Sequence, residues 1–386
     1  MPADSDFRLL FIHVGVKTHN PAIPTLISAF QDLSNPNVHS IDLLTTSLSE
    51  LQSELKWSSL ALIERTLFQN VENSAGMKFF IQYTSTPVEN HLRSGVSIIL
   101  DSDAELGLLA GNYDLHAPLL ENFNGTQLSR FSILVWPYVV RPIAREEVRS
   151  AYRDDWMGIG LDPLANWKAI TAEIPRQIEY THMLNANEIK SVPKIQLFDA
   201  CVPGSGYATR KIALSSLKSQ NLSSAPFTST DRWLRGMTKI FSRGLLTETT
   251  IKTRFYLRQK NMNFLIRSSK SAYVCGSGYE YFVRKFLEVP ALGVPLVAYP
   301  VPALERLGFE EGLHYRAAFP EEYSNVAQDL LASHSATAKL IFESIQLMRT
   351  YHCSASRVKD LVAALSLVSS EESKGAQFTR GRLKPA

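Results

Sequence analysis

Two carboxylates and two cations stand close together in the second half of the chain. Glu280 and Glu288 are separated by seven residues, among which Arg284 and Lys285 are adjacent. If a helix begins near Tyr281, the carboxylates lie about 12 Å apart, because each helical residue rises about 1.5 Å. This separation excludes a shared atom and predicts contacts with two parts of an elongated ligand. One carboxylate can accept ribose hydroxyls and the other sugar hydroxyls, while the cations neutralise a diphosphate between them.

A purely structural interpretation of the same residues stays open. Arg284 and Glu288 are four residues apart, which is the spacing of a solvated ion pair on a helix. Glu280 would then only favour the amino end of that helix, where a negative charge interacts well with the helix dipole. In this interpretation the segment binds no ligand.

Two glycine-bearing turns follow β-like runs in the same half of the chain. The run at 194–202 is followed by PGSGYATRK, and the run at 272–275 by GSGYEYF. Glycine lets backbone amides approach an anion closely, and a helix that begins after the turn adds partial positive charge. We therefore expect these turns to bind phosphate through Gly204, Gly206, Gly278 and Tyr279.

The first β-like run, RLLFIHVG, contains His13 and Gly15 at its carboxyl end. In open parallel sheets, ligands bind outside the carboxyl ends of the strands. His13 is therefore a candidate catalytic residue and Gly15 a candidate nucleotide-sugar-binding residue. His116 is a weaker candidate for the same region, because a single histidine often has only a structural role.

The chain of 386 residues is long enough for two α/β domains. Strand-like and helix-like segments alternate, which predicts a doubly wound parallel sheet in each domain. AELGLLA, for example, is expected to be one of the helices. The expected parts are a first domain at 1–165, a helical connector at 166–190, a second domain at 191–345, C-terminal helices at 346–368 and a flexible tail at 369–386.

Composition narrows the class of protein. The net charge of +3 is too small to predict general binding to nucleic acid. Three widely spaced cysteines predict neither a disulfide framework nor a zinc site. The sequence has no visible secretion signal or membrane-spanning run, so we expect a cytoplasmic protein.

One basic segment also contains aromatic residues. Between Lys252 and Lys270 the chain reads KTRFYLRQKNMNFLIRSSK. Such a segment can rest on anionic lipid, which predicts peripheral membrane contact. The alternative, which the pattern favours, is the solvated face of helices that surround a folded core.

YEYFVRKFLEVPALGVPLV resembles the Glu-x7-Glu signature of GT-B glycosyltransferases. Its matching positions are Glu280, Glu288, Ala291 and Gly293, followed by an apolar strand. PVPALERLGFEEGLHY resembles the family's next loop. FDACVPGSGYATRK, LIRSSKSAYVCGSGYE and YHCSASRVKDLV resemble its spore-maturation-protein-like branch, and the likeness covers about residues 194–365.

The resemblance implies two Rossmann-like domains that face each other across a cleft. It implies that Glu288 binds the donor ribose and that Glu280 approaches the transferred sugar. It also implies that Arg210 or Lys211 helps to hold the diphosphate. The implied reaction moves a sugar from a nucleotide-diphosphate sugar to a glycan or other hydroxyl acceptor, without metal or cofactor and with retention at the anomeric carbon. One departure is that the family's usual Gly-Phe-Gly is Tyr281-Phe282-Val283 here.

Three other hypotheses stay open. Asp101 and Asp103 form a D-x-D pattern after an apolar run, and in GT-A glycosyltransferases this pattern binds a divalent metal. A nucleotide-sugar epimerase or hydrolase of the GT-B shape would consume donor without an acceptor. A non-catalytic nucleotide- or carbohydrate-binding protein would bind donor without turnover.

Overall fold

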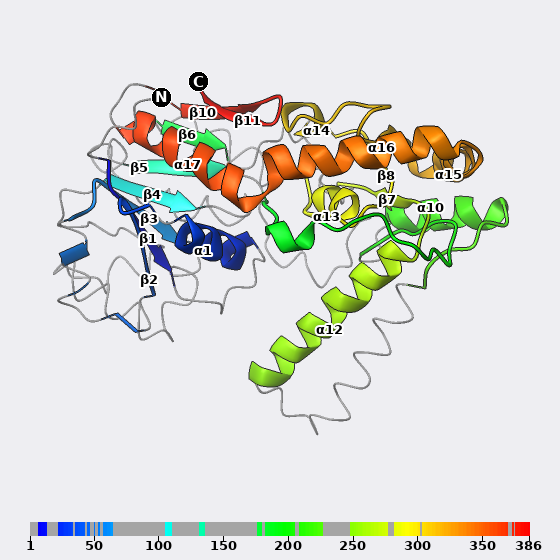
Figure 1. Ribbon diagram of the computed structural model, residues 1–386, viewed down its shortest axis with the longest axis horizontal. Coiled ribbons are helices and arrows are strands. Elements are labelled where there is room, and N and C mark those ends of the chain that lie inside the picture. Colours follow the sequence, from blue (N-terminus) through cyan, green and yellow to red (C-terminus); the bar gives the residue numbers. More distant parts are fainter. Residues whose placement is uncertain are drawn as a thin grey trace. The chain divides into compact units, whose positions relative to one another are not determined.

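A computed structural model gives the fold of the chain (Figure 1). It describes residues 7–13, 22–33, 35–42, 45–46, 50, 53–54, 57–64, 105–109, 131–135, 176–179, 182–204, 208–226, 248–276, 282–301, 303–369, 373 and 375–386. Contacts divide the chain into two compact units. Unit 1 holds the described residues of 1–137, 160–185 and 353–386, and unit 2 holds those of 186–352.

Unit 1 is built on one sheet with the order β11-β10-β6-β5-β4-β3-β1-β2. All neighbouring strands are parallel except β10 and β11. The strand order reverses between β1 and β3, which makes the carboxyl ends of these strands the expected ligand position. The strands are β1 (Leu9–His13), β2 (Val38–Asp42), β3 (Leu60–Glu64), β4 (Glu105–Leu109), β5 (Phe131–Val135), β6 (Arg176–Glu179), β10 (Gly375–Thr379) and β11 (Arg382–Pro385).

Strand β1 lies inside this sheet, and its residues are buried because a central parallel strand is covered on both faces. Helix α1 (Ala22–Asp32) packs on β2. Helix α17 (Ser354–Ser369) packs on α1, β6, β10 and β11. The alternation read from the sequence therefore gives the correct class of fold for unit 1.

Two helix predictions in unit 1 are wrong. Within AELGLLA, Glu105–Leu109 form strand β4, which pairs with β3 on one side and β5 on the other. The segment 166–190, expected to be a helical connector, contains strand β6. In both places, pairing in the sheet overrides a local preference for helix.

The prediction of a flexible tail at 369–386 is also wrong for its described residues. Strands β10 and β11 form a hairpin, and β10 pairs with β6. Arg380 and Gly381 have φ values of 46° and 81°, as a tight two-residue hairpin turn requires. Phe378 is buried, and Cζ of the Arg357 guanidinium lies 4.4 Å from the centroid of the Phe378 ring. Ala376 and Phe378, two residues apart, are thus buried in a segment whose overall polarity predicts disorder.

Unit 2 contains a second parallel sheet, ordered β7-β8-β9. Its strands are β7 (Ala272–Val274), β8 (Leu296–Ala298) and β9 (Arg316–Ala317). Cys201 forms an isolated parallel β-bridge with Ala272, and Ala200 forms one with Ser224. The predicted strand at 194–202 is thus present only as isolated bridges. It lies between Ser224 and β7, so this sheet also reverses its order there.

Helices complete unit 2. Helix α13 packs against β7 and β8, and α15 against β8 and α10. In the described part of the chain, no helix combines the length and apolar character needed to cross a membrane. The helical elements are η4 (Ala186–Glu188), α10 (Ala208–Ser219), α12 (Glu248–Arg267), α13 (Lys285–Ala291), α14 (Ala303–Arg306), η6 (Pro320–Glu322), α15 (Tyr323–Ala332), α16 (His334–Leu347) and the π-helix η7 (Met348–His352).

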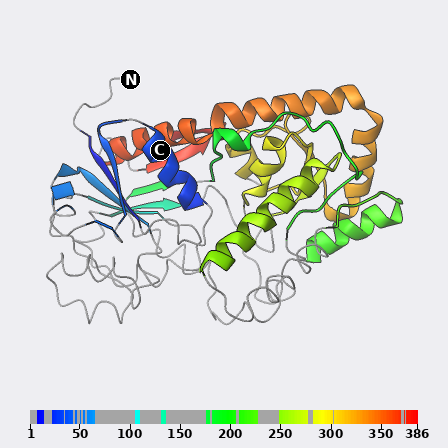
Figure 2. The same cartoon turned by 60° about the horizontal axis from the view of Figure 1, so that its bottom comes forward.

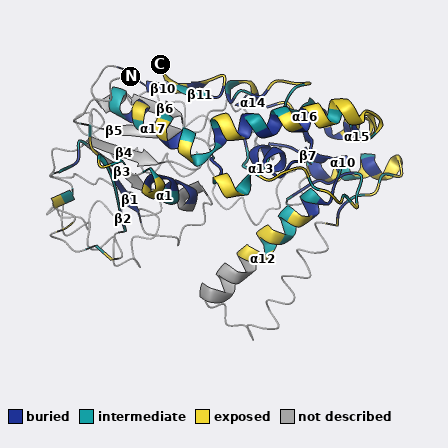
Figure 3. Cartoon of the chain, viewed as in Figure 1, coloured by how far each residue is buried: buried dark blue, intermediate teal, exposed yellow. Residues whose placement is uncertain are grey.

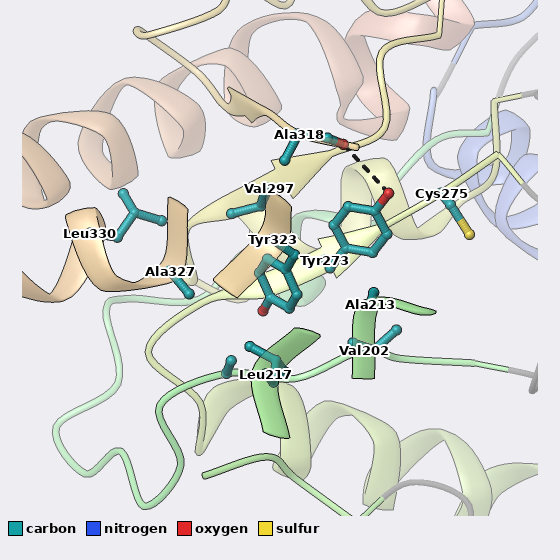
Figure 4. Close-up of a cluster of buried hydrophobic side chains, with 11 residues drawn as sticks. Val202, Ala213, Leu217, Tyr273, Cys275, Val297, Ala318, Tyr323, Ala327 and Leu330 are labelled. Atoms are coloured by element: carbon teal, nitrogen blue, oxygen red, sulfur yellow. Dashed lines mark hydrogen bonds between the residues drawn. The ribbon is translucent and has the colours of Figure 1, made fainter. Parts of the chain in front are cut away.

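Two buried tyrosines fix the strands at the reversal point of unit 2 (Figure 4). The rings of Tyr273 and Tyr323 lie 5.1 Å apart. Tyr273 donates a hydrogen bond from its hydroxyl to the Ala318 carbonyl, and Tyr323 donates one to the Cys201 carbonyl. The carboxyl ends of β7 and of the Cys201 segment are therefore held in the core.

Substitution of Gly293 tests how closely the residue after the α13 C-cap packs against the backbone of Ser191 and Val192. It follows the C-cap residue Leu292 with a φ of 75°, and an added Cβ would lie 3.0 Å from the Ser191 carbonyl oxygen. Gly293→Ala is expected to lower the free energy of unfolding by at least about 2 kcal/mol, from the left-handed backbone plus the backbone contact. Urea denaturation measures this loss.

Gly312→Ala is the matched control. Gly312 has a φ of 79°, but an added Cβ would meet no described atom within 4 Å. Only the backbone cost of about 1 kcal/mol is expected for Gly312→Ala. Equal losses for the two variants would contradict the importance of the Ser191 contact.

Candidate functional site

Glu288 is a buried carboxylate on α13. Its residue is 7% exposed. Oε1 accepts hydrogen bonds from Arg284 Nε at 3.0 Å and from Gln259 Nε2 at 3.4 Å. Oε2 lies 3.7 Å from Lys285 Nζ, and no described residue donates a hydrogen bond to it. The i,i+4 pair expected in the structural interpretation is formed, but it is buried rather than solvated.

Arg284 connects Glu288 to a second carboxylate. Its Nη2 donates to Glu188 Oε1 from the η4 segment, while its Nε donates to Glu288. The guanidinium is therefore held by two acids and orients Oε1 of Glu288. This geometry suits a positioning role for Arg284 more than the direct phosphate contact expected from the sequence.

Lys285 lies in a group of cations. Burial is the largest effect that lowers the pKa of Lys285, and Glu288 acts in the opposite direction. Three guanidinium groups lower this pKa further, namely those of Arg210, Arg258 and Arg284. Clustered like charges that destabilise one another are stabilised when an anion enters. The cluster is thus suited to a phosphate or diphosphate group.

Arg210 reaches this cluster from α10. Its side chain is buried and lies against Gly204, so that an added Cβ on Gly204 would be 2.5 Å from Arg210 Nη1. Gly204 has a φ of 112° and follows the strand segment that contains Cys201. Glycine is required here both for the backbone conformation and for the close approach of the guanidinium. Lys211, the neighbour of Arg210, is exposed on α10.

Phe282, the residue of Tyr281-Phe282-Val283 that matches the central Phe of the family's Gly-Phe-Gly, belongs to the core. Phe282 is 1% exposed, and its ring stacks on that of Phe286 with centroids 5.1 Å apart. It also packs against Phe309. Phe282 therefore fixes the start of α13, which positions Lys285 and Glu288.

His13 lies at the carboxyl end of β1, where the order of the unit 1 sheet reverses. It is 5% exposed, and its Nε2 lies 3.1 Å from Ser40 Oγ. Burial lowers the pKa of His13, and the nearby Asp42 partly opposes this effect. Burial therefore favours the neutral form of the imidazole.

Several predicted residues lie outside the described part of the chain, so their contacts stay predictions. These residues are Gly15, Asp101, Asp103, His116, Gly206, Gly278, Tyr279 and Glu280. Among the residues that the structure describes, no group of three or more His, Cys, Asp or Glu side chains could hold a metal ion.

Sequence reasoning missed three residues around the cluster. Glu188 reaches Arg284 across 96 residues of sequence, and Gln259 reaches Glu288 across 29. The positive charge of Arg258, on α12, lowers the pKa of Lys285. The adjacent pair Arg258-Gln259 lies in the basic segment noted above, but no local pattern separates these two residues from its other polar residues.

Comparisons with known proteins agree with this architecture. A DNA-modifying β-glucosyltransferase is similar in structure with a TM-score of 0.50 and 9% identity, over 94% of this chain and 100% of that one. The HepE protein of Anabaena in complex with UDP gives a TM-score of 0.49 and 12% identity, over 93% and 100%. Sucrose-phosphate synthase from Thermosynechococcus elongatus gives a TM-score of 0.47 and 10% identity, over 94% of this chain and 100% of that one.

No protein-family model and no curated protein sequence matches the chain. The β-glucosyltransferase, at 9% identity, establishes a fold rather than an activity. Both units carry a mainly parallel sheet whose strand order reverses at one point, as the doubly wound sheets predicted from the sequence require. The chain therefore has the two-domain α/β architecture of the GT-B fold.

Proposed function

We propose that the chain is a glycosyltransferase that moves a sugar from a nucleoside-diphosphate sugar to a hydroxyl acceptor. The observation that carries this proposal is Glu288, a buried carboxylate whose Oε2 accepts no hydrogen bond from a described residue and lies 3.7 Å from Lys285 Nζ. Support comes from the fold, because the similar β-glucosyltransferase has uridine diphosphoglucose as its substrate.

The donor would be bound by unit 2. Its ribose hydroxyls would donate to Oε2 of Glu288, and its diphosphate would lie beside Lys285, Arg210 and Arg258. The diphosphate leaves as sugar transfer proceeds, and fixed cations stabilise the charge that develops on it. These cations would do the work that a divalent metal does elsewhere, so that no metal or other cofactor would be needed.

The remaining roles rest on the sequence alone. Backbone amides of Gly206, Gly278 and Tyr279 would contact the phosphates, and Glu280 would approach the transferred sugar. On the acceptor side, His13 would accept a proton from the attacking hydroxyl, and Gly15 would contact the donor. Retention at the anomeric carbon, the spore-maturation-protein-like branch and a cytoplasmic location belong to the same proposal.

A turnover assay tests the proposed reaction. Purified protein is incubated with each of a set of nucleoside-diphosphate sugars, with and without a panel of hydroxyl acceptors. We expect donor consumption that depends on an acceptor, together with a product heavier by one sugar. Equal consumption without acceptor would indicate an epimerase or hydrolase. Donor binding without turnover would indicate a binding protein.

Lys285 gives the site an expected pH dependence. Because its pKa is lowered in the free protein, Lys285 loses its proton at a lower pH than an ordinary lysine. A bound diphosphate favours the charged form and raises this pKa again. Affinity for UDP should therefore fall as pH rises through the lowered pKa, and binding in that range should take up protons.

Calorimetric titrations with UDP in buffers of different ionisation enthalpy measure this uptake. Lys285→Met should bind UDP more weakly at neutral pH and should show no such uptake. Lys218→Met, which removes an exposed lysine from α10, is the matched control and should behave like the unaltered protein. Proton uptake that persists in Lys285→Met would contradict the role assigned to Lys285.

A further inference from the structure

We propose that one face of unit 2 binds an anionic lipid surface. This face, called here the α12 face, consists of four residues of α12 and the exposed residues of the segment that crosses its carboxyl end. Its members are Val192, Lys194, Ile195, Leu197, Tyr256, Leu257, Lys260 and Phe264. It is separate from the donor site, and its function does not depend on the activity proposed above.

The four residues of α12 lie on one side of the helix. Tyr256, Lys260 and Phe264 follow one another at intervals of four residues, and Leu257 lies three residues before Lys260. Tyr256 is 57% exposed, Leu257 45% and Phe264 60%. Lys260 Nζ lies 4.6 Å from the centroid of the Tyr256 ring. Exposed residues mark the middle of α12 in Figure 3.

The segment before Phe198 continues this surface. Arg267 Nη1, at the end of α12, donates to the Ser191 carbonyl at 3.0 Å. The Leu197 amide donates to the Ser268 carbonyl at 2.6 Å, one helical turn after Phe264. The chain between these two anchors therefore crosses the carboxyl end of α12. It exposes Val192 by 50%, Ile195 by 72% and Leu197 by 61%.

The other side of α12 is already occupied. Leu265 and Ile266 are buried at its carboxyl end, and Arg258 and Gln259 act on Lys285 and Glu288. The course of the helix in unit 2 can be followed in Figures 1 and 2. The aromatic residues of the α12 face thus have no part in the core. Six of the nine large apolar side chains that are exposed in the described part of the chain gather on this face.

Charge identifies the partner as an anionic surface. Helix α12 carries five basic residues and a single acid, Glu248 at its first position. The segment 189–198 contains two lysines and no acid. Lysines placed among exposed aromatic and aliphatic side chains are typical of interfacial helices, where apolar groups enter the lipid and cations meet the headgroups.

The sequence alone favours a solvated helix face here. The structure changes this interpretation, because the large apolar residues described in the segment divide between two sides of α12. Tyr256 and Phe264 point outward together with Leu257, while Leu265 and Ile266 point into the core. A merely solvated face would not need three large apolar side chains beside a lysine. Protruding side chains, rather than a groove, also suit a lipid surface better than an acidic peptide.

Vesicle flotation tests the proposal. The full chain is mixed with vesicles of phosphatidylcholine alone, or of phosphatidylcholine with phosphatidylglycerol. We expect flotation with the anionic vesicles only, and its loss at high salt. The double variant Ile195→Ser/Phe264→Ser should reduce vesicle binding by about tenfold or more, because it removes two apolar side chains that would insert into the lipid. Lys194→Glu/Lys260→Glu should have a similar effect.

Phe342→Ser is the matched control, because Phe342 is 58% exposed on α16, outside the α12 face. It should leave flotation unchanged. Absence of binding to anionic vesicles, or equal binding by Ile195→Ser/Phe264→Ser, would overturn the proposal. A dimer in sedimentation velocity that this double variant dissociates, without vesicle binding, would assign the face to a second copy of the chain and also overturn it. UDP binding, measured separately, should be unchanged in all these variants.

Discussion

Glu288→Gln is expected to weaken UDP binding about 100-fold while the protein stays folded. A carboxylate that accepts the ribose hydroxyls contributes about 3 kcal/mol, since hydrogen bonds to charged groups are worth roughly 1.5–3 kcal/mol each. A loss of about 2.8 kcal/mol corresponds to about 100-fold in affinity. Glutamine keeps the volume of the side chain, and its carbonyl oxygen can still accept from Arg284. Calorimetry with UDP measures the affinity.

Stability is measured in the same variant to separate binding from folding. Arg284 keeps its contact with Glu188, so Glu288→Gln should unfold at nearly the unaltered urea concentration. Glu288→Ala is a less suitable test, because it would leave a cavity beside the Arg284 guanidinium. Glu305→Gln, at an exposed position of α14, is the control and should bind UDP normally. Unchanged affinity in folded Glu288→Gln would show that Glu288 does not bind the ribose.

Gly204→Ala is expected to lower UDP affinity about tenfold through Arg210. The added methyl group would lie 2.5 Å from Arg210 Nη1, and the guanidinium is the end of a flexible side chain, so it would move rather than unfold the protein. Displacing one cation from the phosphate site should cost about 1.4 kcal/mol, which is about tenfold. The variant is analysed by UDP calorimetry and by urea denaturation.

Gly312→Ala separates the effect on Arg210 from backbone strain. Both glycines have positive φ, with values of 112° and 79°, so each variant should lose about 1 kcal/mol of stability. Only Gly204→Ala should lose affinity for UDP, because an alanine at Gly312 contacts no described atom. If both variants bind UDP equally well, Arg210 is not a phosphate ligand.

Much of the fold could be predicted from local patterns. The run RLLFIHVG gave β1, and VHSIDLLT gave β2, because a short apolar or alternating run bounded by polar residues is a reliable strand signal. The alternation of such runs with helical segments predicted two parallel sheets. The same reasoning failed for β4, where Ala, Glu and Leu favour a helix but the neighbours β3 and β5 impose a strand.

The C-terminal hairpin shows a second limit of sequence reasoning. Ala376 and Phe378 are enough to hold β10 in the sheet, although the surrounding residues are polar. Its parallel partner β6 lies about two hundred residues earlier in the sequence. Pairing of this kind depends on the whole sheet, so local composition alone predicted a flexible tail.

The candidate site was predicted in part. The spacing around Glu288 placed it on a helix with Lys285, which is confirmed, but α13 begins at Lys285 rather than near Tyr281, and Arg284 is its N-cap residue. The glycine turn drew attention to Arg210. Burial decided between the two interpretations of the Arg284–Glu288 pair, and the sequence has no direct measure of burial. Glu188 and Gln259 could not be found in advance, because their contacts depend on the packing of η4 and α12 around α13.

The most direct test is a crystal structure of the protein with bound UDP. We expect both ribose hydroxyls within hydrogen-bond distance of Glu288 Oε2, with the diphosphate between Lys285 and the Arg210 guanidinium. UDP bound elsewhere, with Glu288 still buried against Arg284 and out of reach of the ribose, would contradict this expectation.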